Sequence, residues 1–461
     1  MLFSASRGSR RGSTLLTSLV TLATALSGVV GGALVASPAE AANRVTPGGF
    51  TGYGFDQCKT PSQEAMDAWL TSSPYWAVGV YMAGKNRYCG DAMQTNLTAT
   101  WVSTQLRNGW RILPITVGPQ APCYVNPQKK IRIDSDPTNN YEAARTQGRR
   151  EARDTVSRAR SLGISEKSTL WYDIEAFDIT KRRCRNSTLS FLSTWTKTLH
   201  DLGYVSGVYS SAASGIRALD RARTNEPGRF TMPDRIWLAE WLTAQEYRSP
   251  FTSGAPSLYS GYIADDGWMP SRRMRQYRGG HTETYGGMTI NIDTNYLDLG
   301  RGTRAGKAPT FCHGTRVDFP SYRRMAFGAR GSQVDAVQCL LKRRDLYRGR
   351  ITGFYNRRTE DAVRRFQRNH DVKASGRMLL STWTMMLSGG RSPVTKIGSG
   401  GNGVRRVQRS LNAATRAGLV VDGIFGTGTT RAVRTYQGQV GLRRTGVVDP
   451  GTWSYLQQGR L

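Results

Sequence analysis

Two carboxylates stand two residues apart in a stretch that is otherwise apolar and aromatic. The stretch reads LWYDIEAFD at 170–178, and the pair is Asp173 and Glu175. In a strand, side chains two apart point to the same face, so both carboxylates would project together. Close carboxylates push their pKa values apart, and cleavage of a glycosidic bond needs one protonated and one ionised carboxyl group. From their spacing alone, the two carboxylates are suited to act together on a ligand in an open pocket.

Other candidate site residues lie at or near the ends of predicted strands. The catalytic candidates are Glu175, Asp173, Asp56 and Asp293. Aromatic side chains at comparable positions offer flat faces on which sugar rings can stack. The substrate-binding candidates are Tyr81, Trp241, Tyr277 and Tyr296.

Each carboxylate also has a purely structural interpretation. Asp56 could cap a following helix, Asp293 could hold a turn, and Asp173 could be a structural hydrogen-bond acceptor. Glu240 is a further carboxylate near a strand end, but alternation leaves its direction open. We favour the catalytic interpretation because three separate strands carry the same chemistry.

An alternation of strands and helices must position these residues. The strand candidates are 53–56, 77–82, 111–118, 168–175, 204–210, 235–241, 273–277 and 290–298. Helical patterns lie between most of them, which predicts a parallel sheet. Eight strands within 50–300 predict an α/β fold, a (β/α)₈ TIM-like barrel. Its first and eighth strands are neighbours, and catalytic groups lie at the carboxyl ends of strands, so the four carboxylates should meet at one mouth.

Motifs around these carboxylates resemble a known family. The motifs are GFDQC (54–58), WYDIEAF (171–177) and IDTNYLD (292–298). They resemble the DUF1906 family, the glycoside-hydrolase-like domain of secreted actinobacterial proteins, over nearly all of 50–300. More distantly, the chain is similar to the GH25 muramidases. The resemblance implies that Glu175 is the general acid and that Asp173 orients or stabilises the oxocarbenium-like centre. It also implies that Asp56 and Asp293 shape the site around the sugar.

The first 41 residues have the pattern of a secretory signal peptide. A basic start leads into an apolar run at 15–35, and Ala39-Glu40-Ala41 offers a cleavage site. The run is long enough for a membrane anchor, but its Gly, Ser and Thr content favours export. We expect a secreted protein, extracellular or cell-wall-associated, with no membrane partner after cleavage.

Six cysteines in the mature chain predict disulfides. They are Cys58, Cys89, Cys123, Cys184, Cys312 and Cys339. An even number in an oxidising compartment favours pairing, and chain proximity favours Cys312 with Cys339. The other four are then left to pair within the N-terminal part. The chain has no CxxC spacing and only four scattered histidines, so we expect no metal site or cofactor.

The C-terminal part contains an internal repeat. A shift of 70 residues aligns 328–388 with 398–457 without a gap, including Val337-Gln338 with Val407-Gln408. The spacings V-x-x-V-Q-x-x-L and T-x-x-A-V-x-x-[FY]-Q each fit one apolar helical face, and a short third helix should begin near T-W. Each copy is therefore predicted to be a small all-α module of three helices. The pattern resembles the peptidoglycan-binding domain of the PG_binding_1 type.

The two copies differ at turn positions. Thr352 stands where the second copy has Asp422, and Asn356 stands where it has Gly426. We expect the loop of the first copy to be held differently and to bind more weakly. The paired aromatic residues are expected in the core, so no ligand residue of the repeats is named.

Charge is uneven along the chain. From 306 onward there are 28 Lys and Arg against 8 Asp and Glu, while 42–305 has 33 against 24. A basic module indicates a polyanionic partner. Export makes nucleic acid a poor partner, so we expect peptidoglycan or another anionic cell-wall polymer, bound by a monomer.

The predicted organisation leads to a predicted function. The segments are 1–41 (signal peptide), 42–305 (barrel), 306–327 (linker), 328–388 and 398–457 (peptidoglycan-binding modules). We expect a secreted glycoside hydrolase-like protein that cleaves peptidoglycan glycan strands while its repeats attach it to the wall. One alternative is a non-catalytic glycan-binding protein with a degenerate barrel. Another is a metal-dependent hydrolase, because clustered carboxylates can hold Mg²⁺ or Ca²⁺.

Overall fold

The computed structural model describes residues 43–461 apart from 244, 248–249, 251–254 and 301–304. The predicted signal peptide lies outside the described residues. Among the helices that are described, none combines the length and the apolar character that crossing a membrane requires.

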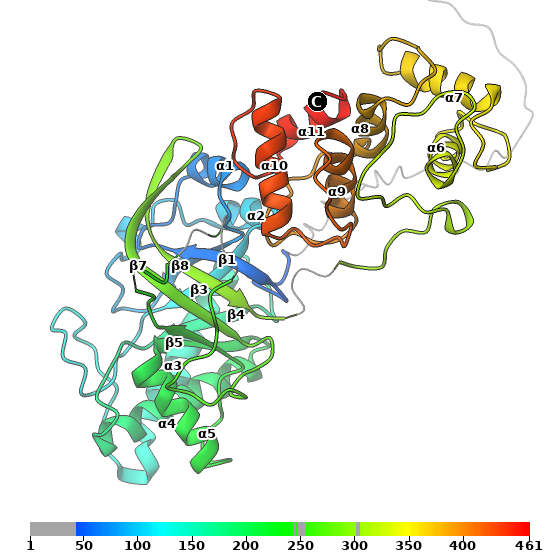
Figure 1. The fold of residues 1–461 in the computed structure, drawn as a ribbon. Helices are drawn as coiled ribbons and strands as arrows, with labels where there is room; N and C mark the ends of the chain where they lie inside the picture. Colours follow the sequence, from blue (N-terminus) through cyan, green and yellow to red (C-terminus); the bar gives the residue numbers. More distant parts are fainter. Residues whose placement is uncertain (1–42, 244, 248–249, 251–254, 301–304) are drawn as a thin grey trace, which may run out of the picture. The chain divides into compact units, whose positions relative to one another are not determined.

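Eight strands close into a barrel in which each strand pairs with the next and the last pairs with the first (Figure 1). The strands are β1 (Thr51–Asp56), β2 (Ala77–Ala83), β3 (Arg111–Thr116), β4 (Thr169–Asp173), β5 (Val205–Ser211), β6 (Arg235–Ala239), β7 (Arg273–Tyr285) and β8 (Met288–Asp298). Each overlaps its predicted range. The predicted eight-stranded barrel is confirmed.

Strand β8 departs from the predicted parallel arrangement. Pairs from β1 to β7 are parallel, whereas β8 is antiparallel to both β7 and β1. The reason is the two-residue turn Gly286-Gly287 between β7 and β8, in which φ is 60° and 85°. Glycine tolerates these angles, and a two-residue turn permits only an antiparallel hairpin. In the resulting register Asp293 lies directly opposite Asp56.

Helices connect the strands and pack against the outside of the barrel. They are α1 (Gln63–Ser72), α2 (Ala99–Asn108), α3 (Thr138–Ser161), α4 (Arg182–Asp201) and α5 (Arg217–Asn225). Shorter turns of helix are η1 (Asp91–Met93), η2 (Ala212–Ile216) and η3 (Cys312–Gly314). Ser62 and Thr98 cap α1 and α2 by accepting from the backbone N–H groups of Ala65 and Trp101. Such caps satisfy donors that have no partner within the helix.

Side-chain alternation along β4 separates the outer core from the interior of the barrel. Tyr172 packs outward on Phe191 and Trp195 of α4, with ring centroids 5.1 and 5.3 Å away. Trp171 points the other way, into a buried apolar cluster to which several strands contribute, and contacts Trp237 edge-on. Asp173 follows Trp171 by two residues, so it also points inward.

Three disulfides form within the described residues: Cys58–Cys89, Cys123–Cys184 and Cys312–Cys339. The pairing that chain proximity favoured, Cys312 with Cys339, is confirmed. The other two bridges lie in the N-terminal part, as expected. The first joins the loops that follow β1 and β2, and the second joins the loop after β3 to the start of α4, so both restrict segments around the mouth of the barrel.

Each C-terminal copy forms three helices, as predicted. The first has α6 (Ser332–Lys342), α7 (Arg357–Arg368) and α8 (Leu380–Ser388), and the second has α9 (Asn402–Ala414), α10 (Thr427–Gln439) and α11 (Pro450–Gln457). The paired aromatic residues Phe366, Tyr436, Trp383 and Trp453 are fully buried. Their predicted place in the core is confirmed, and Phe425 is buried as well, whereas Phe354, another of the aromatic residues expected in the core, is only half-buried.

A buried glutamine holds the loop after the first helix of each copy. In the second copy, Gln408 Nε2 donates to Asp422 Oδ1 at 2.7 Å, and its Oε1 accepts from the N–H of Gly423 at 3.0 Å. In the first copy, Gln338 Oε1 accepts from the N–H of Thr352 at 2.8 Å. Thr352 is the counterpart of Asp422, so the first loop is held one residue earlier. The predicted difference between the two loops is present.

Candidate active site

The four predicted carboxylates line one cavity at the mouth of the barrel. Asp56, Asp173, Glu175 and Asp293 border a space of about 320 Å³. Asp56 and Asp173 end their strands, whereas Asp293 reaches the same place from β8 because that strand runs antiparallel. The expected meeting of these residues at one rim is therefore what the structure shows.

Asp56 is buried and held by three donors. Asn295 Nδ2 donates to Oδ1 at 2.7 Å, Tyr81 Oη donates to Oδ2 at 3.0 Å, and Gln276 Nε2 reaches Oδ1 at 3.4 Å. Burial and the charge of Asp293 raise the pKa of Asp56 to about 7, against the lowering effect of these hydrogen bonds. The carboxyl group thus changes charge near neutral pH while its orientation is fixed.

Asp293 lies opposite Asp56 and shares a donor with it. The N–H of Gly280 donates to Oδ1 at 2.5 Å, and Gln276 Nε2 lies 3.3 Å from Oδ2. Burial raises the pKa of Asp293 although the Gly280 hydrogen bond opposes the shift. Gln276 therefore links the two carboxyl groups and fixes their relative orientation.

Asp173 is buried, and its Oδ1 has no hydrogen-bond partner among the described residues. Burial and the neighbouring charge of Glu175 raise the pKa of Asp173 to about 8, although Lys129 acts in the opposite direction. At neutral pH this carboxyl group therefore retains its proton. A buried polar atom without a partner is costly, so it is typical of a group that meets a ligand.

Glu175 lies beyond the end of β4, nearer solvent than Asp173. Its side chain is 34% exposed and its Oε1 forms an ion pair with Lys129 Nζ. Burial lowers the pKa of Lys129, but the charges of Asp173 and Glu175 raise it more. The ammonium group thus balances the charge of the exposed carboxylate in the free protein.

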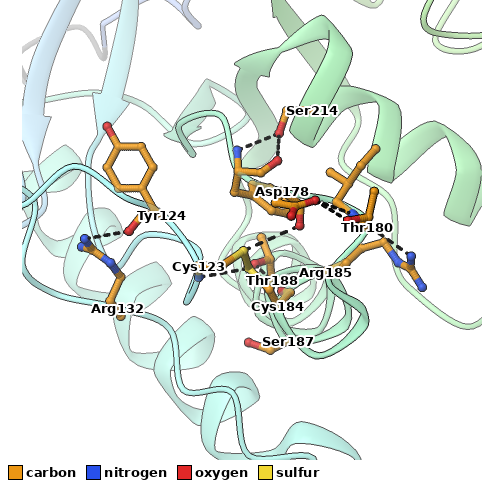
Figure 2. The surroundings of a disulfide bond; sticks show 12 residues. Cys123, Tyr124, Arg132, Asp178, Thr180, Cys184, Arg185, Ser187, Thr188 and Ser214 are labelled. Carbon is orange, nitrogen blue, oxygen red and sulfur yellow. Dashed lines mark hydrogen bonds between the residues drawn. A yellow bond between two sulfur atoms is a disulfide. The ribbon is translucent and has the colours of Figure 1, made fainter.

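The loop that carries Lys129 is fixed by several contacts. Gln120 bridges the segment after β4: its Nε2 donates to the carbonyl oxygen of Asp173, and its Oε1 accepts from the N–H of Glu175, each at 2.8 Å. Three residues later, the Cys123–Cys184 disulfide ties the loop to the start of α4 (Figure 2). Lys129 is therefore held near Glu175 by the loop in which it lies.

The aromatic candidates divide between the cavity and the outer surface of the barrel. Tyr81 lines the cavity and bonds Asp56. Trp241 is 64% exposed, and its Nε1 donates to Gln276 Oε1 at 3.2 Å. Tyr277 and Tyr296 are not brought to the cavity; they pack outward, on Tyr247 and Tyr53 respectively. Their neighbours in sequence Gln276 and Asn295 point inward, so alternation turns these two rings away.

Some residues of the site did not emerge from sequence reasoning. They are Tyr88, Lys129, Gln120, Gln276 and Asn295. Gln276 and Asn295 could have been found, since each lies two residues from another inward position of its strand. The loop residues carry no periodic signal. In the described part of the chain, no group of three or more His, Cys, Asp or Glu side chains is placed to hold a metal ion.

Comparison with known proteins gives two family matches. The family described as "Rv2525c-like, glycoside hydrolase-like domain" matches residues 67–297, and the PG_binding_1 peptidoglycan binding domain matches 330–386 and 400–456. Comparison with curated proteins found no match.

Two solved structures are similar at low identity. An uncharacterized B. stearothermophilus protein is 18% identical with a TM-score of 0.34, over 53% of this chain and 95% of its own. The modular autolysin LytC from Streptococcus pneumoniae is 13% identical with a TM-score of 0.30, over 53% of this chain and 46% of its own.

Proposed function

Because the chain belongs to the Rv2525c-like, glycoside hydrolase-like family, we propose that its barrel hydrolyses glycosidic bonds in peptidoglycan glycan strands. The two families that the sequence motifs resemble are the families whose models match the chain. Together they support a function related to the glycans of the cell wall. The observation that supports hydrolysis is the cavity in which four carboxylates with different environments meet.

Asp173 and Glu175 share one proton, which can lie on either carboxyl group. In the free protein Asp173 holds the proton, and Glu175 pairs with Lys129. A saccharide that enters the cavity and separates Lys129 from Glu175 raises the cost of charge on Glu175. The proton then passes to Glu175, the more exposed carboxyl group, which donates it to the glycosidic oxygen as general acid. Asp173 is left ionised beside the oxocarbenium-like centre.

Asp56 and Asp293 orient the sugar from the opposite side of the cavity. Both carboxyl groups are fixed by hydrogen bonds from Gln276, and Tyr81 fixes Asp56 further. Fixed acceptors select one orientation of sugar hydroxyl groups. Trp241 and Tyr88 are exposed and offer their rings to neighbouring sugar units.

The test is the release of reducing ends from purified sacculi by the mature chain. Glu175→Gln should lower the rate by at least about 100-fold, the contribution expected of general acid catalysis. Glu166→Gln is the matched control, because Glu166 is an exposed carboxylate that pairs with Arg160 and does not line the cavity. Equal release by wild type and Glu175→Gln would reject hydrolysis of this substrate.

A second candidate function is glycan binding without cleavage. The ion pair between Lys129 and Glu175 favours this candidate, because the carboxylate of an ion pair has no proton to donate to a glycosidic oxygen. This candidate predicts that the chain is pulled down with sacculi, that Glu175→Gln leaves binding intact, and that no reducing ends appear.

The proposal includes secretion to the cell wall. Three disulfides are typical of an oxidising compartment outside the cytosol, and the two C-terminal domains supply attachment to peptidoglycan. Fractionation of the producing cells should recover the chain in the wall or the medium.

A further inference from the structure

A cavity on the second C-terminal copy is lined by arginine. Its volume is about 780 Å³, and the residues around it are Arg431, Arg434, Thr435, Gly438, Gln439 and Arg444. Five belong to α10, and Arg444 comes from the loop that follows this helix. No carboxylate is among these six lining residues, so the cavity carries a concentrated positive charge.

Two glycines allow the arginines to lie close to the helix. A Cβ atom on Gly438 would stand 2.3 Å from Arg444 Nε, so any larger residue there would displace Arg444. A Cβ atom on Gly446 would stand 3.2 Å from Arg434 Nε. The backbone therefore brings guanidinium groups from α10 and from the following loop to one place.

The first copy provides an internal comparison, because its sequence aligns with the second without a gap. Arg364, the counterpart of Arg434, forms an ion pair with Glu360 at 3.0 Å, and Glu360 is replaced by Thr430 in the second copy. Asp361 stands where the second copy has Arg431. With Arg365 and Arg368 included, the aligned positions of the first copy have three arginines against Glu360 and Asp361, a net charge of +1, whereas those of the second copy have three arginines and no carboxylate, a net charge of +3.

Two further differences build the cavity only in the second copy. Arg368 occupies the position of Gly438, and Ala374 occupies the position of Arg444. The first copy therefore lacks both the glycine that leaves space beside the helix and the arginine whose side chain lies next to that glycine. The same fold presents two different surfaces.

We propose that this arginine cavity binds carboxylate groups of peptidoglycan stem peptides. A guanidinium group is planar and pairs with carboxylates through two parallel hydrogen bonds, and three such groups around one cavity can hold more than one carboxylate. The inference rests on the proposed attachment of the repeats to peptidoglycan. It goes further by assigning attachment to one face of α10 in one copy.

The test uses the full mature chain and purified sacculi at low ionic strength, where charge pairs are least screened. The double variant Arg431→Gln/Arg444→Gln should weaken binding about tenfold, in keeping with loss of charge-assisted hydrogen bonds. The matched control is Arg358→Gln/Arg368→Gln, which removes two exposed charges from α7 of the first copy. The control should bind within about twofold of wild type, because these two arginines are as exposed as Arg431 and Arg444 but do not line the cavity.

Two treatments of the sacculi identify the bound group. Amidation of their carboxylates should remove the difference between wild type and the double variant. Removal of attached phosphate-containing polymers should leave that difference unchanged. The opposite pattern would assign the cavity to phosphate and overturn the proposal.

Other outcomes separate the two proposals. Wild-type binding by Arg431→Gln/Arg444→Gln, or equal weakening by the control, would overturn the assignment of the cavity while leaving attachment intact. A wild-type chain that does not bind sacculi at all would overturn attachment and, with it, the cavity.

Discussion

Neighbouring carboxyl groups in this cavity differ because burial, hydrogen bonding and countercharge reach them unequally. Asp173 is buried, and its Oδ1 has no hydrogen-bond partner in the part of the chain that the structure describes. Asp56 is buried and accepts from three donors, whereas Glu175 is partly exposed and forms an ion pair with Lys129. Separated environments of this kind let one carboxyl group keep a proton while another is ionised. The surroundings of each carboxyl group therefore determine whether it could exchange a proton with a substrate.

The pH dependence of glycan release follows from the two shifted groups. Asp56 must be ionised, and it gains a proton as the pH falls through about 7. Asp173 must be protonated in the free protein, and it loses its proton as the pH rises through about 8. The pH profile of kcat/KM should therefore be bell-shaped with its maximum between these values.

Tyr81→Phe is the matched variant for this profile. It removes a hydrogen bond that lowers the pKa of Asp56, so the acid limb should move to higher pH while the alkaline limb stays in place. An acid limb that is the same in both proteins would show that another group controls it.

The buried carboxyl group of Asp173 also makes stability depend on pH. Its pKa is about 8 in the folded chain and about 4 when unfolded. Between these values the folded state binds the extra proton, so stability falls as the pH rises through this window. Asp173→Asn should remove that loss and raise the free energy of unfolding above pH 8 by roughly 2–5 kcal/mol. Denaturant unfolding at pH 5 and at about pH 9 measures the effect. An equal gain at both pH values would argue against titration of Asp173.

At the scale of elements, the loop that follows β3 links the Cys123–Cys184 disulfide to Glu175 in the cavity. It carries Gln120 and Lys129, and Cys123 ties it to α4 (Figure 2). Removing the bridge with Cys123→Ser/Cys184→Ser should lower stability by about 4 kcal/mol, given that 61 residues separate the cysteines. Glycan release should fall as well, because the segment from Asp173 to Glu175, which Gln120 of this loop holds, loses its fixed position.

The Cys312–Cys339 bridge supplies the control for this loop. Its cysteines are 27 residues apart, so Cys312→Ser/Cys339→Ser should cost a similar amount, about 3–4 kcal/mol. It lies outside the barrel strands, so release of soluble glycan fragments should stay at the wild-type rate. Equal loss of release in both double variants would mean that stability, and not the loop, is responsible.

How far the sequence predicts these elements depends on the range of the interactions that build them. Strand positions follow from local alternation, and the inward direction of Asp173 follows from its spacing to Trp171. The antiparallel direction of β8 has a local signal in the turn residues Gly286-Gly287, but the prediction of a parallel sheet did not take this signal into account. The same alternation turns Tyr277 and Tyr296 outward. Lys129 has no local signal, because its contact with Glu175 spans 46 residues of sequence and depends on the fold.

At the scale of the whole molecule, a barrel with a small polar cavity is joined to two peptidoglycan-binding domains. A cavity of about 320 Å³ holds only a small part of a glycan strand, so its own affinity for the strand should be weak. Attachment through the repeats raises the local concentration of wall glycan around the barrel. Catalysis on an insoluble polymer and on soluble fragments should therefore depend differently on the repeats.

A chain that ends after residue 305 tests this dependence. On soluble glycan fragments its rate should equal that of the full mature chain, because the carboxylates of the cavity all lie before that point. On sacculi at low protein concentration its rate should fall by about 100-fold, the lower end of the gain expected from a second linked binding site. Added salt should lower release by the full chain toward that of the short one, since the segment from 306 onward carries an excess of Lys and Arg over Asp and Glu. Equal release from sacculi by both chains would mean that the barrel finds its substrate without the repeats, and the two families joined in this chain would then act on the wall independently.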